Sequence, residues 1–353
     1  MSVSFFRKKY FLLFVGRPLG WLYGIGAWLH RAAYVYGPFK RHRFAPFVIS
    51  VGNLSVGGTG KSPHVLYLQH LLGATERTAM VSRGYGRKTK GVQWVQTDSQ
   101  AQTVGDEPLQ FKLAHPKALV VVAEQRAKGI QAALQKQPQL EQVLLDDAMQ
   151  HWGIQADCTF MLTTFAAPFF RQHVLPFGQL REFRSGYKRA EVIIVTQSPS
   201  GLGGSIRNSY LVEIKPLPHQ KVLFSWLSYK PLYDLWTGAV GPSLKTGQEM
   251  LLLTGIADTT ALKKYLSKHT ITEYAFPDHH LFTLKDLQKV QENARNKLII
   301  TTEKDATRLR PVLQQNPSIP LQIYVLPVEV VFSPDDAAWL KEYLQAQKAK
   351  KMA

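Results

Sequence analysis

The sequence is poor in cysteine and in negative charge. Of its 353 residues only Cys158 is a cysteine, so no disulfide can close within the chain and no pair of cysteines has zinc-binding spacing. This usage suits a reducing compartment. Lysine and arginine number 43 against 25 aspartates and glutamates, which gives a formal net charge of +18. Because such a field attracts anions, we expect a nucleic acid, an anionic membrane surface or a phosphorylated substrate as partner.

A long uncharged run is also lacking near the N-terminus. Residues 18–29 carry no charge, but a bilayer span needs about 20 apolar residues. Pro18 suits the first turn of a helix. Apolar residues then recur at spacings of three and four: Trp21, Leu22, Ile25, Trp28, Leu29 and Ala32. With Lys and Arg on both sides, the pattern predicts that residues 1–36 form an amphipathic helix in the headgroup region of a membrane. The alternative is an ordinary helix packed on the protein.

Glycines are concentrated where an apolar strand, 47–51, meets the start of a helix. The connecting loop consists of Ser55, Val56, Gly57, Gly58, Thr59, Gly60, Lys61 and Ser62. Glycines allow the backbone to turn several N–H groups towards phosphate oxygens, and the helix N-terminus adds partial positive charge. In such a loop the lysine reaches the β- and γ-phosphates and the hydroxyl can bind Mg²⁺. Ser55 replaces the glycine of the full pattern. We predict that the loop binds ATP and Mg²⁺.

Strand-like apolar runs alternate with helical stretches along the chain. The expected strands are 47–51, 78–82, 118–122, 142–145, 192–196, 250–255, 297–302 and 321–326. Helices are expected at 64–72, 126–136, 261–268 and 335–348, a loop at 199–208, and a solvated, frayed basic tail from Lys348. Such alternation predicts an α/β fold with a mostly parallel sheet covered on both faces.

The length favours two domains. We expect three parts: the amphipathic helix at 1–36, a phosphate-loop NTPase-like domain at 37–215, and a smaller α/β domain at 216–353 that closes over the cleft. The composition changes near the prolines at 216–218, which places the boundary there.

Two pairs of adjacent carboxylates are candidates for chemical roles. An apolar strand ends in Asp146 and Asp147, and a carboxylate there can hold the Mg²⁺ that bridges the ATP phosphates. The adjacent acids Asp106 and Glu107 precede Pro108, which is equally typical of an ordinary helix N-terminus.

A second chemical cluster is His279 and His280 after Asp278, inside an apolar frame. No further histidine or cysteine stands at zinc-like spacing, so a hydrogen-bonded His–Asp pair acting on a hydroxyl makes better use of these types than a metal site. Residues 301–305, Thr-Thr-Glu-Lys-Asp, close a strand where ligands of α/β sheets bind.

Together these motifs resemble the tetraacyldisaccharide 4′-kinases, the lipid A kinases of Gram-negative bacteria. The resemblance covers nearly the whole chain. The segments that carry it are 51–63, 82–87, 104–108, 146–151, 175–182, 276–280 and 301–305. It implies transfer of the γ-phosphate of ATP to the 4′-hydroxyl of a lipid-anchored disaccharide 1-phosphate. It also implies a two-domain α/β protein, peripheral on the cytoplasmic face of the inner membrane.

The resemblance also implies residue roles. Asp106 is the expected base, paired with His279, and Lys61 is the expected phosphate contact. The expected Mg²⁺ ligands are Ser62, Asp146, Asp147 and Glu182. Four arginines are candidates to meet the 1-phosphate of the substrate: Arg83, Arg87, Arg181 and Arg184. Phe183 stands where the family usually has proline.

Two other classes of function remain open on the residues alone. A regulatory or chaperone phosphate-loop NTPase would use water as acceptor and hydrolyse ATP without lipid. A nucleic-acid-dependent ATPase would explain the positive charge, but the sequence contains no recognisable nucleic-acid module. We therefore expect a membrane surface and a lipid substrate as partners, with neither nucleic acid nor an obligatory protein partner.

Overall fold

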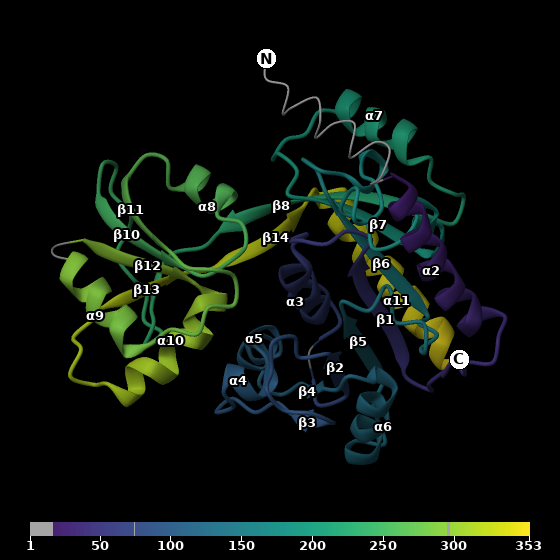
Figure 1. The fold of residues 1–353 in the computed structure, drawn as a ribbon, viewed down its shortest axis with the longest axis horizontal. Helices are drawn as coiled ribbons and strands as arrows, with labels where there is room; N and C mark the ends of the chain where they lie inside the picture. The colour runs from purple at the N-terminus through teal and green to yellow at the C-terminus, as the bar shows by residue number, and fades with distance from the viewer. Residues whose placement is uncertain (1–16, 74, 295–296) are drawn as a thin grey trace. The chain divides into compact units, whose positions relative to one another are not determined.

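The computed structural model describes residues 17–73, 75–294 and 297–353, and the chain forms two compact units (Figure 1). The first unit contains the chain up to Ser82, together with Gln125–Trp226 and Val330–Ala353. The second unit contains Arg83–Glu124 and Leu227–Glu329. The chain therefore passes between them four times. This division differs from the ranges 37–215 and 216–353 expected from composition, because 83–124 groups with residues from the later half of the chain.

The first unit is built on a parallel sheet. Its strands pair in the order β8-β7-β6-β1-β5-β2, and every one of these pairs is parallel. Their bounds are β1 (Phe47–Asn53), β2 (Thr78–Ser82), β5 (Gln142–Asp146), β6 (Cys158–Thr164), β7 (Val192–Thr196) and β8 (Lys221–Tyr229). Strands β1, β2, β5 and β7 are buried along their whole length, as expected when helices cover both faces.

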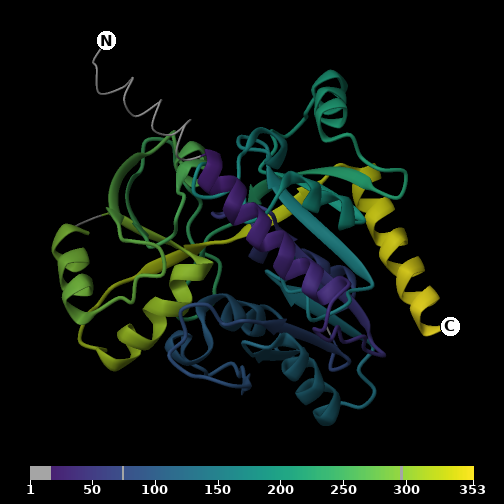
Figure 2. The same cartoon turned by 45° about the vertical axis from the view of Figure 1, so that its right-hand side comes forward.

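Helices cover this sheet. They are α2 (Arg17–Val35), α3 (Lys61–Leu71), α6 (Arg126–Lys136), α7 (Gly204–Ile214) and α11 (Pro334–Met352), with 3₁₀ turns η2 (Phe169–Arg171) and η3 (Arg184–Arg189). Figure 2 shows α2 in purple and α11 in yellow. The short strand β14 (Val328–Phe332) leads into α11.

The second unit has a five-stranded sheet in the order β11-β10-β12-β13-β9. The first four strands are parallel and β9 is antiparallel to β13. Their bounds are β9 (Tyr233–Asp234), β10 (Glu249–Thr254), β11 (Thr270–Ala275), β12 (Leu298–Thr302) and β13 (Ile323–Leu326). Helices α8 (Thr260–Tyr265), α9 (Leu284–Asn293) and α10 (Glu303–Gln315) complete this part.

The remaining elements of the second unit come from residues 83–124. They are β3 (Gln93–Trp94), α4 (Ala101–Val104), α5 (Asp106–Ala114) and β4 (Leu119–Val122). Helix α5 packs against α10, and this contact joins the early segment to the later one.

The predicted α/β fold with a mostly parallel sheet is confirmed, but two local predictions are wrong. The Ser- and Gly-rich stretch 199–208 is not a loop throughout, because α7 begins at Gly204. The basic end of the chain is not a frayed tail. Helix α11 continues to Met352, and Lys348 and Lys351 form ion pairs at 2.8 Å with Glu141 and Asp157.

Helix α2 confirms a helix at residues 17–35 of the predicted segment 1–36, and residues 1–16 of that segment lie outside the described residues. Its apolar side chains lie largely in solvent: Trp21 and Leu22 are each 66% exposed, and Leu29 is 55% exposed. Gly20 and Gly24 lie on the opposite, packed side, since a Cβ at Gly24 would meet the Phe183 ring at 2.4 Å. Within the described part of the chain, none of the helices has the length and hydropathy that a bilayer crossing requires.

Candidate active site

The glycine loop joins the carboxyl end of β1 to the first residue of α3. Gly57 and Gly60 have positive φ, 105° and 75°, so the turn uses conformations that other residues rarely adopt. The backbone N–H of Val56 donates to the carbonyl of Gln179 at 2.8 Å, and Ser55 and Leu180 form an isolated antiparallel β-bridge. Helix α3 starts at Lys61, so the partial positive charge of its N-terminal end lies at the loop.

Side chains from neighbouring strands hold the loop in place. The hydroxyl of Thr196, at the end of β7, donates to the carbonyl of Thr59 at 3.0 Å. The side-chain amide of Asn53, at the end of β1, donates to the Thr59 hydroxyl at 2.9 Å. Because a fixed loop does not have to be ordered when an anion binds, these contacts favour binding.

Two cations and one carboxylate meet beside the loop. The Lys61 Nζ lies 3.9 Å from Asp147 Oδ1, and Arg181 Nη1 lies 3.1 and 3.2 Å from the two Asp147 oxygens. Asp147 has a φ of 44°, which is uncommon for a residue other than glycine. The chemistry of this group, with two positive charges and one negative, suits a polyanion that carries a divalent cation.

Asp146 is the last residue of β5, next to β1 in the sheet, and pairs in register with Val51. Its side chain is buried, and Oδ2 accepts a hydrogen bond from the Ser82 hydroxyl at 3.0 Å. Ser62 follows Lys61 in the first turn of α3. Hydroxyl and carboxylate oxygens are the ligands that Mg²⁺ prefers, so these residue types fit that ion. No group of three or more His, Cys, Asp or Glu in the described ranges forms a complete metal site.

Glu182 lies in a different setting from the two aspartates. Both of its carboxylate oxygens are engaged: Oε2 accepts from Arg189 at 2.8 Å, and Oε1 accepts from Gln150 at 2.8 Å. Gln150 also accepts from Arg181 at 3.4 Å, so a polar chain leads from Asp147 to Glu182. As placed, Glu182 anchors Arg189 rather than presenting an open carboxylate.

A second cluster lies in the second unit and is centred on Asp106. This residue opens α5 directly after Gly105, which has a φ of 93°. His279 Nδ1 lies 2.9 Å from Asp106 Oδ2, and His279 itself has a φ of 61°. The two residues are 173 positions apart in the chain but belong to one compact unit. The pair expected from the sequence is therefore formed within this unit.

Two cations flank this pair. Lys304 Nζ lies 3.8 Å from Asp106 Oδ2, 3.6 Å from Glu107 and 3.7 Å from Asp278. Arg308 is buried with Nη1 at 3.9 Å from Asp106, while its Nη2 donates to Asp305 at 2.6 Å. Both cations project from α10, four residues apart on one face.

These charges set the protonation of the pair. Burial would raise the pKa of Asp106, but the hydrogen bond from His279 and the charges of Lys304 and Arg308 outweigh it, so this pKa lies below its ordinary value. The hydrogen bond to Asp106 raises the pKa of His279 above its ordinary value, against the opposing effect of burial. The proton of the pair is consequently held on the imidazole, next to an ionised carboxylate.

Sequence reasoning missed the role of the two cations of α10. Lys304 belongs to the Thr-Thr-Glu-Lys-Asp motif, and its position after a strand indicated a ligand site. The motif did not indicate that Lys304 would lie beside Asp106, Glu107 and Asp278. Arg308 had no signal at all, because its contact with Asp106 depends on how α10 packs against α5.

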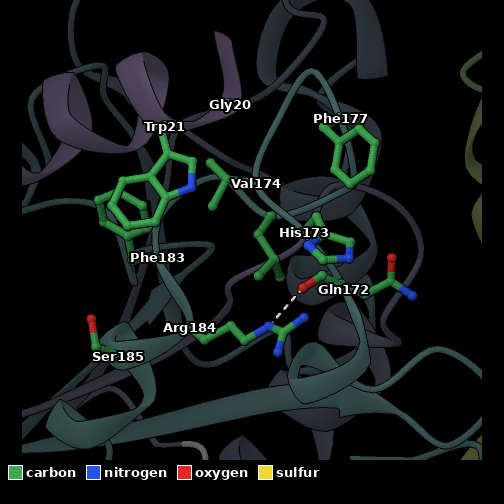
Figure 3. Close-up of a pocket in the computed structure, with 10 residues that line it drawn as sticks. Gly20, Trp21, Gln172, His173, Val174, Phe177, Phe183, Arg184 and Ser185 are labelled. Carbon is green, nitrogen blue, oxygen red and sulfur yellow. Dashed lines mark hydrogen bonds between the residues drawn. The ribbon is translucent and has the colours of Figure 1, made fainter. Parts of the chain in front are cut away.

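A pocket of about 490 Å³ opens in the first unit between α2 and the segment 172–185 (Figure 3). Its walls are mostly apolar and are made by Trp21, Val174, Phe177, Leu180 and Phe183. The rings of Trp21 and Phe183 meet edge to face with centroids 5.6 Å apart.

Four arginines were expected to face an anionic substrate, and the structure separates them into two classes. Arg87 pairs with Glu124 at 2.6 Å and Arg181 pairs with Asp147, so both are engaged within their own units. Arg83 and Arg184 are exposed. Arg184 lines the pocket, where its Nε donates to the carbonyl of Gln172 at 2.7 Å (Figure 3).

Comparison with known proteins identifies the family to which the chain is similar. Residues 12–347 match the family model described as tetraacyldisaccharide-1-P 4′-kinase. Tetraacyldisaccharide 4′-kinase of Phocaeicola vulgatus is 36% identical over 330 residues, covering 90% of each chain. The enzyme of the same name from Flavobacterium psychrophilum is 36% identical and covers 94% of each chain.

A solved structure is also similar. It is the crystal structure of LpxK from Aquifex aeolicus, described as an "apo" form in complex with ATP. The TM-score is 0.72 at 26% identity, with 94% of this chain and 97% of that chain covered. The chain therefore belongs to the tetraacyldisaccharide-1-phosphate 4′-kinase family.

Proposed function

We propose that this protein is an ATP-dependent lipid kinase that phosphorylates the 4′-hydroxyl of a tetraacyldisaccharide 1-phosphate. Membership of the family supports the reaction, and the contact between His279 and Asp106 at 2.9 Å is the observation that carries it. A sugar hydroxyl is a weak nucleophile, and a positioned base accelerates its attack by about 10²–10⁴-fold. A hydrolase that used water as acceptor would not need a lipid for turnover.

The phosphate loop has the role of holding the nucleotide. Lys61, the loop N–H groups and the start of α3 supply positive charge for the polyphosphate of ATP. Ser62, Asp146 and Asp147 are the residues that would hold Mg²⁺, and Glu182 supports them through Gln150 and Arg181. Bound Mg²⁺ supplies charge neutralisation for the β- and γ-phosphates.

The Asp106–His279 pair has the role of the base. The substrate 4′-oxygen forms a bond to the γ-phosphorus of ATP, and the bond from this phosphorus to the bridging oxygen breaks. The electron pair leaves with ADP, and the hydroxyl proton passes to the pair. Because the carboxylate keeps the imidazole oriented and basic, the pair accepts one proton where an isolated aspartate, with a pKa of about 3.9, is a poor acceptor.

The exposed face of α2 and the pocket beside it have the role of meeting the lipid. Tryptophans and leucines that remain in solvent on one helix face are typical of a helix lying in the membrane interface. This supports a peripheral position at a membrane surface, for which the family resemblance implies the cytoplasmic face of the inner membrane. We assign the pocket next to α2 to an acyl chain of the substrate because its walls are mostly apolar. Arg184 at this pocket and the exposed Arg83 are the candidates for the substrate 1-phosphate.

Transfer of labelled γ-phosphate from Mg-ATP to a detergent-solubilised disaccharide 1-phosphate lipid tests the function. We expect a phosphorylated lipid with the wild type and its loss with Asp106→Ala and Lys61→Ala. Release of free phosphate at the same rate with and without lipid would instead identify a phosphate-loop NTPase that uses water.

The membrane role has its own test. Leu22→Glu with Leu29→Glu places two charges on the exposed face of α2, away from the pocket, and should lower binding to anionic vesicles and raise KM for the lipid. Binding of an ATP analogue should not change. Vesicle binding equal to that of the wild type would overturn the interfacial role of α2.

A further inference from the structure

His64 is a buried histidine that the kinase chemistry described above does not use. It is the fourth residue of α3, three positions after Lys61, and its side chain is 1% exposed. Its Nδ1 lies 2.7 Å from the carbonyl oxygen of Gly60, and its Nε2 lies 2.9 Å from the hydroxyl of Ser225 in β8. Both partners are in the first unit, so the whole contact lies within one body.

The partners determine where the imidazole proton resides. A carbonyl oxygen can only accept, so Nδ1 must carry the hydrogen and donate to Gly60. His64 is 1% exposed and its ring lies between two uncharged partners, and burial without a paired charge disfavours the protonated form, so the imidazole is neutral. A neutral imidazole has one donor and one acceptor, so Nε2 accepts from the Ser225 hydroxyl. The Gly60 carbonyl therefore determines the tautomer, and the hydrogen bond from Ser225 holds the ring with Nδ1 towards the loop.

The Gly60 carbonyl is part of the peptide that ends in the Lys61 N–H. In a trans peptide the N–H points opposite to the C=O. Because the Gly60 carbonyl is held towards His64, the Lys61 N–H of the same peptide points to the other side of the loop. The preceding peptide behaves in the same way: Thr196 holds the Thr59 carbonyl, so the Gly60 N–H points away from Thr196. Two consecutive N–H groups are thus aimed by side chains behind the loop.

We propose that His64, oriented by Ser225, is a positioning residue for phosphoryl transfer, and that it aims the Gly60–Lys61 peptide at the nucleotide phosphates. The inference rests on the proposed function in taking this loop as the ATP site. Gly60 needs such a hold because its φ of 75° lies in a region from which glycine can readily move. The ring of Phe332 in β14 packs edge-on against His64, with centroids 6.2 Å apart, and limits rotation of the imidazole.

Two amide substitutions separate positioning from packing. The side-chain nitrogen of Asn lies near the place of Nδ1, whereas that of Gln lies near the place of Nε2. The backbone N–H of His64 also donates to the Gly60 carbonyl, at 3.3 Å, and remains in every variant. His64→Gln removes the shorter side-chain bond, and we expect about a five- to tenfold loss in affinity for a non-hydrolysable ATP analogue and in kcat, as for one lost hydrogen bond. His64→Asn restores this bond and should stay within about threefold of the wild type.

The matched control is His70→Gln, the same change on the exposed side of the same helix, which should alter neither value. Melting temperature is recorded for every variant. Equal losses in the Asn and Gln variants that follow the melting temperature, or a Gln variant with unchanged affinity and kcat, would overturn the proposal.

Long-range ¹H–¹⁵N correlation spectra of protein with labelled histidine give an independent readout. We expect the hydrogen of His64 on Nδ1 in the wild type, and a shift of this equilibrium in Ser225→Ala. A hydrogen on Nε2 in the wild type would overturn the proposal. Since analogue binding and these spectra need no lipid, a wild type that fails to phosphorylate the lipid would count against the proposed function alone.

Discussion

The two candidate clusters, one in each unit, are built from different kinds of group. In the first unit the candidate site is the backbone of the loop 55–62, whose shape is determined by glycines and by the start of a helix. In the second unit the candidate site consists of side chains: His279, Lys304 and Arg308 each lie within 3.9 Å of Asp106. The first arrangement is suited to binding many kinds of anion, because N–H groups recognise the negative charge alone, while the second is suited to moving one proton.

This difference teaches where specificity resides. A backbone site tolerates exchanges such as Ser62 for threonine, because N–H groups belong to every residue. A side-chain site depends on each partner, since removal of one charge changes the pKa of the others. Variants should therefore separate nucleotide binding from transfer.

The largest effect should come from Asp106→Asn, which keeps the shape of the side chain but cannot accept a proton. We expect kcat to fall by about 10²–10⁴-fold while the affinity for an ATP analogue stays unchanged. Asp98→Asn, an exposed site in the same unit, is the control. A variant that loses nucleotide binding, or keeps its turnover, would contradict the division of labour between the two clusters.

Lys61→Met should come next. Loss of a charged contact to phosphate costs about 1.5–3 kcal/mol, so the Kd for the analogue, measured by calorimetry, should rise by about 10–100-fold. Lys128→Met on α6 removes an exposed lysine of the same unit and should leave the Kd unchanged. If both variants bind equally well, the loop does not hold the nucleotide through Lys61.

A smaller effect separates two adjacent glycines. A Cβ at either Gly57 or Gly58 meets no atom within 4 Å, but only Gly57 has a positive φ, 105°. Gly57→Ala should therefore lower the free energy of unfolding by about 1–3 kcal/mol through backbone strain alone. Gly58→Ala should change it by less than about 0.5 kcal/mol. Denaturant unfolding without nucleotide measures both, and equal values would show that the loop conformation does not need glycine at 57.

The smallest change should follow from Lys304→Met, read from the pH profile of kcat/KM. Transfer requires the unprotonated pair, so kcat/KM rises with pH through the raised pKa of His279. The charge of Lys304 lowers this pKa. Its removal should move the rising limb to higher pH and cost a few-fold in rate at neutral pH. Lys285→Met on the exposed face of α9 should not move the limb. A shift to lower pH would contradict this assignment of the base.

Much of the first unit was predictable because local pattern and fold agree there. The expected strand at 78–82 and helix at 126–136 have the observed bounds, and the loop motif lies between a strand and a helix as predicted. Strand β6 was missed because a single short apolar run, such as its residues 160–162, does not distinguish strand from helix.

The second unit was less predictable because it depends on contacts between distant segments. Composition assigned residues 83–124 to the same domain as the loop, yet α5 packs against α10, nearly 200 positions later. The pairing of Asp106 with His279 was expected from family resemblance, whereas the position of Arg308 follows only from that packing. The role of His64 was equally hidden, since Ser225 lies 161 positions away.

The late return of the chain to the first unit has a consequence for synthesis. Strand β1, which leads into the phosphate loop, is translated early, but α11, which packs against it, is translated last. The buried Cys158 of the neighbouring strand β6 contacts Tyr343 of α11 at 3.7 Å, so this contact can also form only after α11 has been translated. Residues 227–329 of the second unit have left the ribosome before that cover exists. The sheet of the first unit is therefore the last to be completed on the ribosome, and its uncovered strands are the part of the nascent chain most exposed to aggregation.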